Sequence, residues 1–199
     1  SLDKYTTMIM VSGSYNQLTK TDIEKINNWA KKGNTLITIA RGSSWAIEKE
    51  LVKESLVEPI KDSIFSRKNY VSAAENIGRE RIGGAILNIN LDLTHPLAFG
   101  YRDSSIPVYK NNNVFIKKTQ DHYSSVGIYS KDPHIDGYIS EENLKNNFKN
   151  SASLIVSKLG LGRVILFADN PNFRGAWYGT NKLFLNAIFY GNNINVPTN

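Results

Sequence analysis

The sequence predicts an α/β protein whose sheet is mostly parallel and carries an antiparallel hairpin or edge. Two runs rich in β-branched and apolar residues, Thr6 to Val11 and Thr35 to Ala40, have the character of buried strands. The segment between them is long enough for a helix, and such a pair forms a right-handed βαβ unit with parallel strands. A third apolar run, Val164 to Ala168, leads through a polar loop into a helical pattern.

The first helix is predicted from its end signals. Thr19 is placed to cap it, while Thr21 and Glu24 form a competing capping box. Gly33 ends the helix. A second helix is predicted from Arg41 to about Glu54, and residues 55–80 show no clear period.

The middle of the chain predicts several strands and one helix. Arg81 to Leu93 has strand character with a kink at Gly83-Gly84, and Ser140 caps a helix. Shorter strand-like pieces lie between them, at Ile106 to Tyr109, Val114 to Lys117 and Ser125 to Tyr129.

The end of the chain predicts a hairpin followed by a helix. Ala152 to Lys158 and Arg163 to Ala168 flank a glycine-rich turn. Thr180 is placed to cap the last helix, which ends at Gly191. No linker divides the chain, so we predict one domain over residues 1–191 and a polar tail over residues 192–199.

Composition excludes several classes of function. The 199 residues contain no Cys, which excludes disulfides, thiolate metal sites and a cysteine nucleophile. The net charge is +6, but Lys and Arg are scattered among acids, so we expect no nucleic-acid partner. No apolar run is long enough to span a membrane. The chain begins with Ser1 rather than Met, which indicates an excised fragment.

Gly42-Ser43-Ser44-Trp45-Ala46 resembles the Gly-x-Ser-x-Gly elbow, with Ala in place of the last Gly. In that interpretation Ser44 is a nucleophile that needs a histidine base. In the alternative interpretation Gly42 makes a turn and a serine caps the helix.

A second candidate site follows the strand that ends near Ala168. Asp169 could act as a general base or contact a ligand, or it could hold its own loop by accepting N–H groups or pairing with Arg174. The aromatic residues beside Arg174 either bind a partner or cover the end of the sheet. The candidate ligand or interaction residues are Asp169, Asn170, Phe173, Arg174, Trp177 and Tyr178.

No metal motif is present. His95, His122 and His134 lie far apart in the sequence, and neither His-Glu-x-x-His nor His-x-x-Glu occurs. We therefore predict no metal site and no cofactor in this chain.

The run from Gly160 to Ala187, with Asp169-Asn170-Pro171-Asn172-Phe173-Arg174 at its centre, resembles the C-terminal region of large bacterial zinc carboxypeptidases of the carboxypeptidase A type, as found in Bacteroidetes-like bacteria. Thr94 to Tyr101 and Gly137 to Ser140 are similar to the same region, so the resemblance spans most of the chain.

This resemblance implies a class I glutamine amidotransferase-like domain, a flavodoxin-like three-layer sandwich. Such domains have a strand before the one at Thr6, which implies that the chain begins inside its domain. The family elbow is Gly-x-Cys-x-Gly; here Ser44 stands at the Cys position and Ala46 replaces the second Gly. The His-Pro-Glu of active amidotransferases is also missing, which argues against glutamine hydrolysis.

Three functional hypotheses follow. The first is a non-catalytic accessory domain of a periplasmic or secreted zinc carboxypeptidase. It would pack against the catalytic domain, which would hold the zinc, or help to position a peptide substrate. The second is a serine hydrolase that uses Ser44. The third is a carbohydrate- or peptide-binding module built on the aromatic residues.

Overall fold

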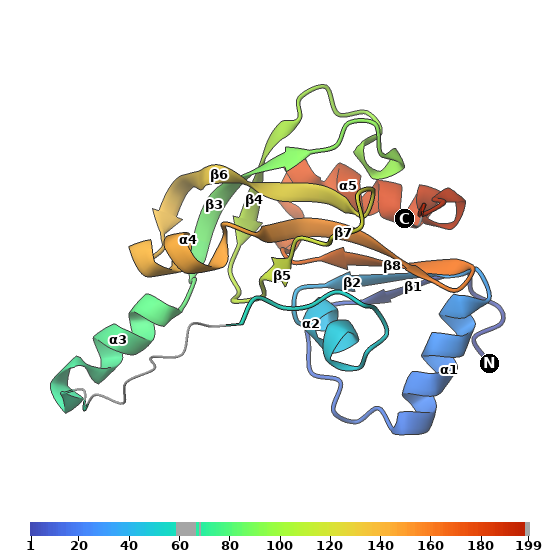
Figure 1. Ribbon diagram of the computed structural model, residues 1–199, viewed down its shortest axis with the longest axis horizontal. Helices are drawn as coiled ribbons and strands as arrows, with labels where there is room; N and C mark the ends of the chain where they lie inside the picture. The colour runs from blue at the N-terminus through green and yellow to red at the C-terminus, as the bar shows by residue number, and fades with distance from the viewer. Residues whose placement is uncertain (59–66, 68, 198–199) are drawn as a thin grey trace.

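The computed structural model describes residues 1–58, 67 and 69–197. Its strands form one mixed sheet in the order β1-β2-β8-β7-β6-β3-β4, and β5 pairs with β7 beside this path (Figure 1). The strands are β1 Thr7–Met10, β2 Thr35–Ile39, β3 Gly84–Leu91, β4 Ser105–Lys110, β5 Ile116–Lys117, β6 Ser125–Tyr138, β7 Ser151–Leu159 and β8 Gly162–Phe167. The α-helices are α1 Lys20–Lys31, α2 Arg41–Glu48, α3 Ala73–Glu80, α4 Glu141–Asn147 and α5 Tyr178–Tyr190.

The βαβ unit is present as predicted. β1 pairs with β2 in parallel, and α1 joins them. Thr19 caps α1 as predicted, through a capping box with Asp22: the Thr19 Oγ1 accepts from the Asp22 N–H, and Asp22 accepts from the Thr19 N–H. Thr21, of the competing box with Glu24, lies inside the helix. β8 then pairs with β2 in parallel, so the parallel part consists of β1, β2 and β8.

The prediction of a mostly parallel sheet is wrong. From β8 onward every pairing is antiparallel: β8 with β7, β7 with β6 and β5, β6 with β3, and β3 with β4. For the β7–β8 pair the physical reason is the short connection, because a parallel crossover needs a dozen or more residues and usually a helix. The β7–β8 turn has only two residues between strands, with Gly160 at φ 62°, a conformation that glycine adopts without strain.

Helices cover both faces of the sheet, as a layered α/β fold requires. On one face α1 and α2 bury Trp29, Ala30 and Trp45 against β2, β7 and β8. On the other face α5 buries Leu183 and Ala187. Figure 1 shows α1 and α2 on the opposite side of the sheet from α5.

Several element ends differ from the sequence prediction. α2 ends at Glu48 rather than near Glu54. α5 begins at Tyr178, so Thr180 lies inside the helix instead of capping it. Ile194 and Val196, in the segment predicted as a polar tail, are buried in the core.

Part of the region without a clear period, residues 59–66 and 68, lies outside the described residues. No helix among the described residues is long and apolar enough to cross a membrane.

Candidate functional site

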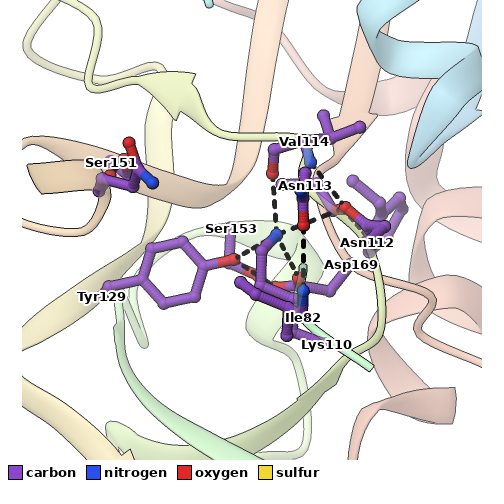
Figure 2. Close-up of polar contacts among 12 residues, drawn as sticks. Ile82, Lys110, Asn112, Asn113, Val114, Tyr129, Ser151, Ser153 and Asp169 are labelled. Carbon is purple, nitrogen blue, oxygen red and sulfur yellow. Dashed lines mark hydrogen bonds and ion pairs between the residues drawn. The ribbon is translucent and has the colours of Figure 1, made fainter. Parts of the chain in front are cut away.

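The candidate site is centred on Asp169, a buried residue just beyond the carboxyl end of β8. Its Oδ1 accepts a hydrogen bond from Lys110 Nζ at 3.0 Å. Its Oδ2 accepts from the Tyr129 hydroxyl and the Ser153 hydroxyl, each at 2.6 Å (Figure 2). Four segments of the sheet, the ends of β4 and β8 and the interiors of β6 and β7, therefore meet on one carboxylate.

Lys110 is the cation of this cluster, and its side chain is fully buried. Besides Asp169, its Nζ donates to the Val114 carbonyl at 2.7 Å and lies 3.4 Å from Asn112 Oδ1. The Nζ also stands 4.6 Å from the centroid of the Phe115 ring. A buried ammonium that finds acceptors for its protons beside a carboxylate is the arrangement that makes a buried ion pair tolerable.

Burial sets the protonation of the cluster. Desolvation lowers the pKa of Lys110, and the neighbouring Asp169 partly offsets this effect. Desolvation raises the pKa of Tyr129, and the adjacent Asp169 charge raises it further, so this phenol stays protonated and donates to the carboxylate.

The network also explains the curvature of the sheet. β4 and β8 are separated by β7, β6 and β3 in the strand order, yet Lys110 bonds directly to Asp169. Asn112 adds a second link, because its Nδ2 donates to the Ala168 carbonyl at 3.2 Å. The sheet must therefore curl until the end of β4 returns to the end of β8, and these contacts hold it there.

The chemistry open to Asp169 is limited by these bonds. Both carboxylate oxygens already accept from protein donors, so Asp169 is poorly placed to take a proton from a substrate as a general base. A small hollow beside it is lined partly by Ser153, Asp169, Asn170 and Thr180, and it has room for roughly one water. The geometry favours a structural role for this carboxylate.

The loop after Asp169 is held by its own polar side chains. Asn170 Oδ1 accepts from the Asn172 N–H at 3.0 Å, and the Thr180 hydroxyl donates to the Pro171 carbonyl at 2.7 Å. Asp169 pairs with Lys110, not with Arg174 as one interpretation predicted. Arg174 is exposed and has φ 53°, a left-handed conformation that is uncommon for a residue other than glycine.

Aromatic side chains pack beneath this loop. The ring of Phe173 stacks on Tyr109, with centroids 4.0 Å apart, and Trp177 lies tilted 6.1 Å from Tyr109. Arg174 covers Phe173, with its guanidinium carbon 5.2 Å from the ring centroid. Tyr178 remains 77% exposed. The structure thus separates the predicted residues into a packed pair, Phe173 and Trp177, and an outward pair, Arg174 and Tyr178.

The strand-to-helix elbow lies at Ala40, four residues before the predicted nucleophile Ser44. Ala40 has φ 48° and ψ −112°, a strained backbone conformation between β2 and α2. A nucleophile elbow presents its reactive residue at such a strained turn, and here that residue has only a methyl group. Two positions later, a Cβ on Gly42 would lie 2.6 Å from the Met10 carbonyl oxygen, so this position requires glycine.

Ser44 itself is an ordinary helix residue. Its hydroxyl donates to the Arg41 carbonyl at 3.1 Å, within the first turn of α2. Among the described side chains no hydrogen bond joins Ser44 to a histidine: His95 Nδ1 accepts from the Leu97 N–H, and His134 Nε2 bonds the Gly137 carbonyl. The arrangement needed to activate a serine is thus not formed around Ser44.

Within residues 1–58, 67 and 69–197 no three His, Asp or Glu side chains gather as a metal site would require. Lys110, Tyr129, Ser153 and Asn112 were not predicted as site residues. The sequence offered a signal for only two of them, since a polar Lys110 closes an apolar strand run and leads into three asparagines that include Asn112.

Comparison with known proteins is informative only at the level of fold. No family model matches the chain, and no curated protein matches it. A ThuA-like protein from Parabacteroides merdae superposes with a TM-score of 0.58 at 11% identity, over 100% of this chain and 74% of the other. A Thermoplasma acidophilum protein, proposed to belong to GMP synthase, gives 0.53 at 13% identity, over 94% and 73%. PurLQS from Thermotoga maritima gives 0.50 at 16% identity, over 95% and 81%.

These likenesses define the class of fold. The chain has an α/β fold of the glutamine amidotransferase-like and ThuA-like kind, with a mixed sheet. At these identities the likeness carries no statement about activity.

Proposed function

We propose that this chain is a non-catalytic accessory domain with an amidotransferase-like fold. The observation that carries the proposal is Ala40, whose methyl group stands at the strained turn where an elbow nucleophile would stand. The absence of Cys from the sequence supports it, and so does Asp169, whose two oxygens are occupied by protein donors.

We further propose that the parent protein is a zinc metallocarboxypeptidase that hydrolyses C-terminal peptide bonds. This part rests on the sequence resemblance of the region from Gly160 to Ala187. In such a parent the zinc belongs to the catalytic domain, and the protein is periplasmic or secreted. The domain described here packs against that catalytic domain or helps to position the peptide substrate.

The surface proposed for this contact is the outer side of the Asp169–Tyr178 loop. Arg174 and Tyr178 are exposed there, and both residue types are frequent among the residues that dominate interface energies. The network behind them ties the loop to four strands, so the loop meets a partner already ordered, which lowers the entropy cost of binding.

A second candidate function is the binding of a carbohydrate or peptide by the same loop. The Nε1 of Trp177 favours it, because this buried N–H donor has no acceptor among the described residues. A glycan and peptide array on this chain tests the idea, with Trp177→Phe as the variant that removes the donor. Specific binding that Trp177→Phe abolishes is expected of such a binding module, and an array without specific binding contradicts it.

The serine hydrolase hypothesis has a direct test in fluorophosphonate labelling. We expect no label that depends on Ser44, because its hydroxyl is bonded within α2 and lacks a histidine partner among the described side chains. The wild type and Ser44→Ala are therefore expected to label equally, with a known serine hydrolase as positive control. A label that disappears in Ser44→Ala would overturn the non-catalytic proposal.

A further inference from the structure

The far end of β6 contains the one Asp-Gly pair of the sequence, Asp136-Gly137. An aspartate before glycine can close a ring on itself, because glycine has no side chain beside the backbone nitrogen that attacks the carboxyl group. The product is a succinimide, which water opens to aspartate or to isoaspartate. The chain contains no Asn-Gly pair, so Asp136-Gly137 is the position at which its sequence most favours this chemistry.

The structure holds the two reacting groups of this pair together. The Gly137 N–H donates to Asp136 Oδ1 at 2.8 Å, so the nitrogen already stands against the carboxyl group that it would attack. The Gly137 carbonyl accepts from His134 Nε2 at 2.7 Å, which fixes the other side of the glycine within the same short segment. Ring closure therefore starts from a contact that the fold has already made.

The fold also requires glycine at this position. Gly137 has φ 83°, in the left-handed region that side chains disfavour, and a Cβ on it would lie 2.5 Å from the Gly84 carbonyl oxygen. The residue that β3 and β6 need for their close approach is thus the same residue that leaves the attacking nitrogen unhindered. The reactive pair is built into the pairing of these two strands.

The strand is irregular beside this pair. The register of β3 with β6 shifts between Ile86, which pairs with Asp136, and Leu87, which pairs with His134, so Ile135 is an extra residue on β6. Such a bulge disrupts the ladder locally and leaves the extra residue unpaired. Asp136 therefore has more freedom for the rotation that ring closure requires than a residue inside a regular ladder.

We propose that Asp136 is a modification site, at which the folded chain forms a succinimide spontaneously and isomerises to isoaspartate. The Gly137 nitrogen forms a bond to Asp136 Cγ, while the proton of that N–H and the hydroxyl of the carboxyl group leave together as water. A second water then opens the ring. Opening at the former side-chain carbonyl restores aspartate, and opening at the backbone carbonyl leaves the chain linked through the side chain, as isoaspartate. The reaction takes place within the chain and requires no partner.

Isomerisation changes the pairing of β3 with β6. It inserts one carbon into the backbone between Asp136 and Gly137, although Gly137 already lies close against the Gly84 carbonyl. The pairs of Gly137 with Ala85 and of Tyr138 with Gly84 must then move out of register. We expect the isomerised protein to unfold at a lower urea concentration than the fresh protein.

The test incubates the folded chain at mildly acidic pH in water labelled with heavy oxygen and then maps its tryptic peptides by mass spectrometry. Each passage through the succinimide places one heavy oxygen in the product. We expect the peptide of residues 132–145 to gain label and to separate into an aspartate and an isoaspartate form. In Asp136→Glu this peptide is expected to stay unlabelled, because the longer side chain would have to close a larger ring.

Asp103-Ser104 is the matched control within the same sample. Asp103 is exposed and precedes a small residue, but among the described residues no hydrogen bond joins its carboxylate to the Ser104 N–H. The peptide of residues 103–110 is therefore expected to gain several times less label than 132–145. Equal label in the two peptides, or label in 132–145 that persists in Asp136→Glu, would overturn the proposal. Neither result bears on peptidase activity, so the modification and the accessory role are tested separately.

Discussion

At the scale of single residues, the buried pair of Lys110 and Asp169 has the largest expected effect. Lys110→Met removes the ammonium and leaves a buried carboxylate with only hydroxyl donors. Breaking a buried ion pair in this way costs about 3–5 kcal/mol of unfolding free energy, which urea denaturation measures.

Two further variants make this prediction specific. Lys118→Met removes an exposed lysine and is expected to change stability by less than ~0.5 kcal/mol. The double change Lys110→Met with Asp169→Leu removes both charges and is expected to recover part of the loss. A Lys110→Met protein as stable as the Lys118→Met protein would show that the ion pair does not hold the strand ends together.

The half-buried Tyr101 and the buried Tyr129 predict an alkaline limit to stability. Burial raises the pKa of Tyr101 to about 12, and burial with the Asp169 charge raises the pKa of Tyr129. In the unfolded chain both phenols ionise near pH 10. Above that pH the folded state binds more protons than the unfolded state, so unfolding free energy falls as the pH rises from about 10 to about 12.

Denaturation curves at successive pH values measure this fall. Tyr101→Phe is expected to reduce its slope, because one of the groups that must ionise on unfolding is gone. Tyr123→Phe, at an exposed tyrosine, is expected to leave the slope as in the wild type. Equal slopes for Tyr101→Phe and Tyr123→Phe would contradict a contribution of Tyr101 to the loss of stability at high pH.

At the scale of elements, the turn into α2 depends on close backbone approach. Gly42→Ala would put a Cβ 2.6 Å from the Met10 carbonyl oxygen. Relieving this overcrowded contact is expected to lower the unfolding free energy by about 1–3 kcal/mol. Gly179→Ala is the matched control in another helix, α5, where nothing lies within 4 Å of the added atom. It is expected to stabilise the protein by ~0.5–1 kcal/mol, because alanine favours the helix.

Thermal or urea unfolding measures the change in stability of both glycine variants. The expected result is opposite signs for the two changes. Destabilisation of similar size in both would mean that contact between α2 and the end of β1 does not fix the elbow.

The elements also show where sequence reasoning worked and where it failed. The βαβ unit and the β7–β8 hairpin were predictable, because apolar runs, a cap at Thr19 and a glycine turn are local signals. The elbow motif at Gly42 to Ala46 was misplaced relative to the strained turn, since the conformation of Ala40 depends on how α2 packs beneath β1. The strained backbone at Ala40 could not be predicted from the residue type, because alanine does not signal such a turn.

At the scale of the whole molecule, the curl of the sheet explains why most of the candidate site could not be predicted from the sequence. Asp169 was recognised as a strand-end acid, but its partners Lys110, Tyr129 and Ser153 lie 59, 40 and 16 residues away in the chain. They meet only because the antiparallel strands bring β4 back to β8. The sequence contains each of these residues without indicating that they share one site.

The structure changes the role expected for the loop after Asp169. The Asp169 carboxylate makes its hydrogen bonds inside the protein, whereas Arg174 and Tyr178 face solvent on a loop that the strands hold in place. The proposed accessory role needs such a surface, whereas a nucleophile-elbow mechanism would need a reactive side chain at the elbow. The elbow residue is alanine, and the strand-end acid is already bonded on both oxygens.

The most direct test is the peptidase activity of the proposed full-length carboxypeptidase with Arg174→Ala and Tyr178→Ala together. Both side chains are exposed, so the domain is expected to fold normally, which circular dichroism verifies. We predict a fall in kcat/KM of about tenfold, equivalent to the loss of about 1.4 kcal/mol at the domain contact. The matched control, Arg41→Ala with Tyr123→Ala, removes the same residue types outside the loop and is expected to keep full activity. Unchanged activity, stability and substrate range in the Arg174 and Tyr178 variant would contradict the proposed accessory role of this loop.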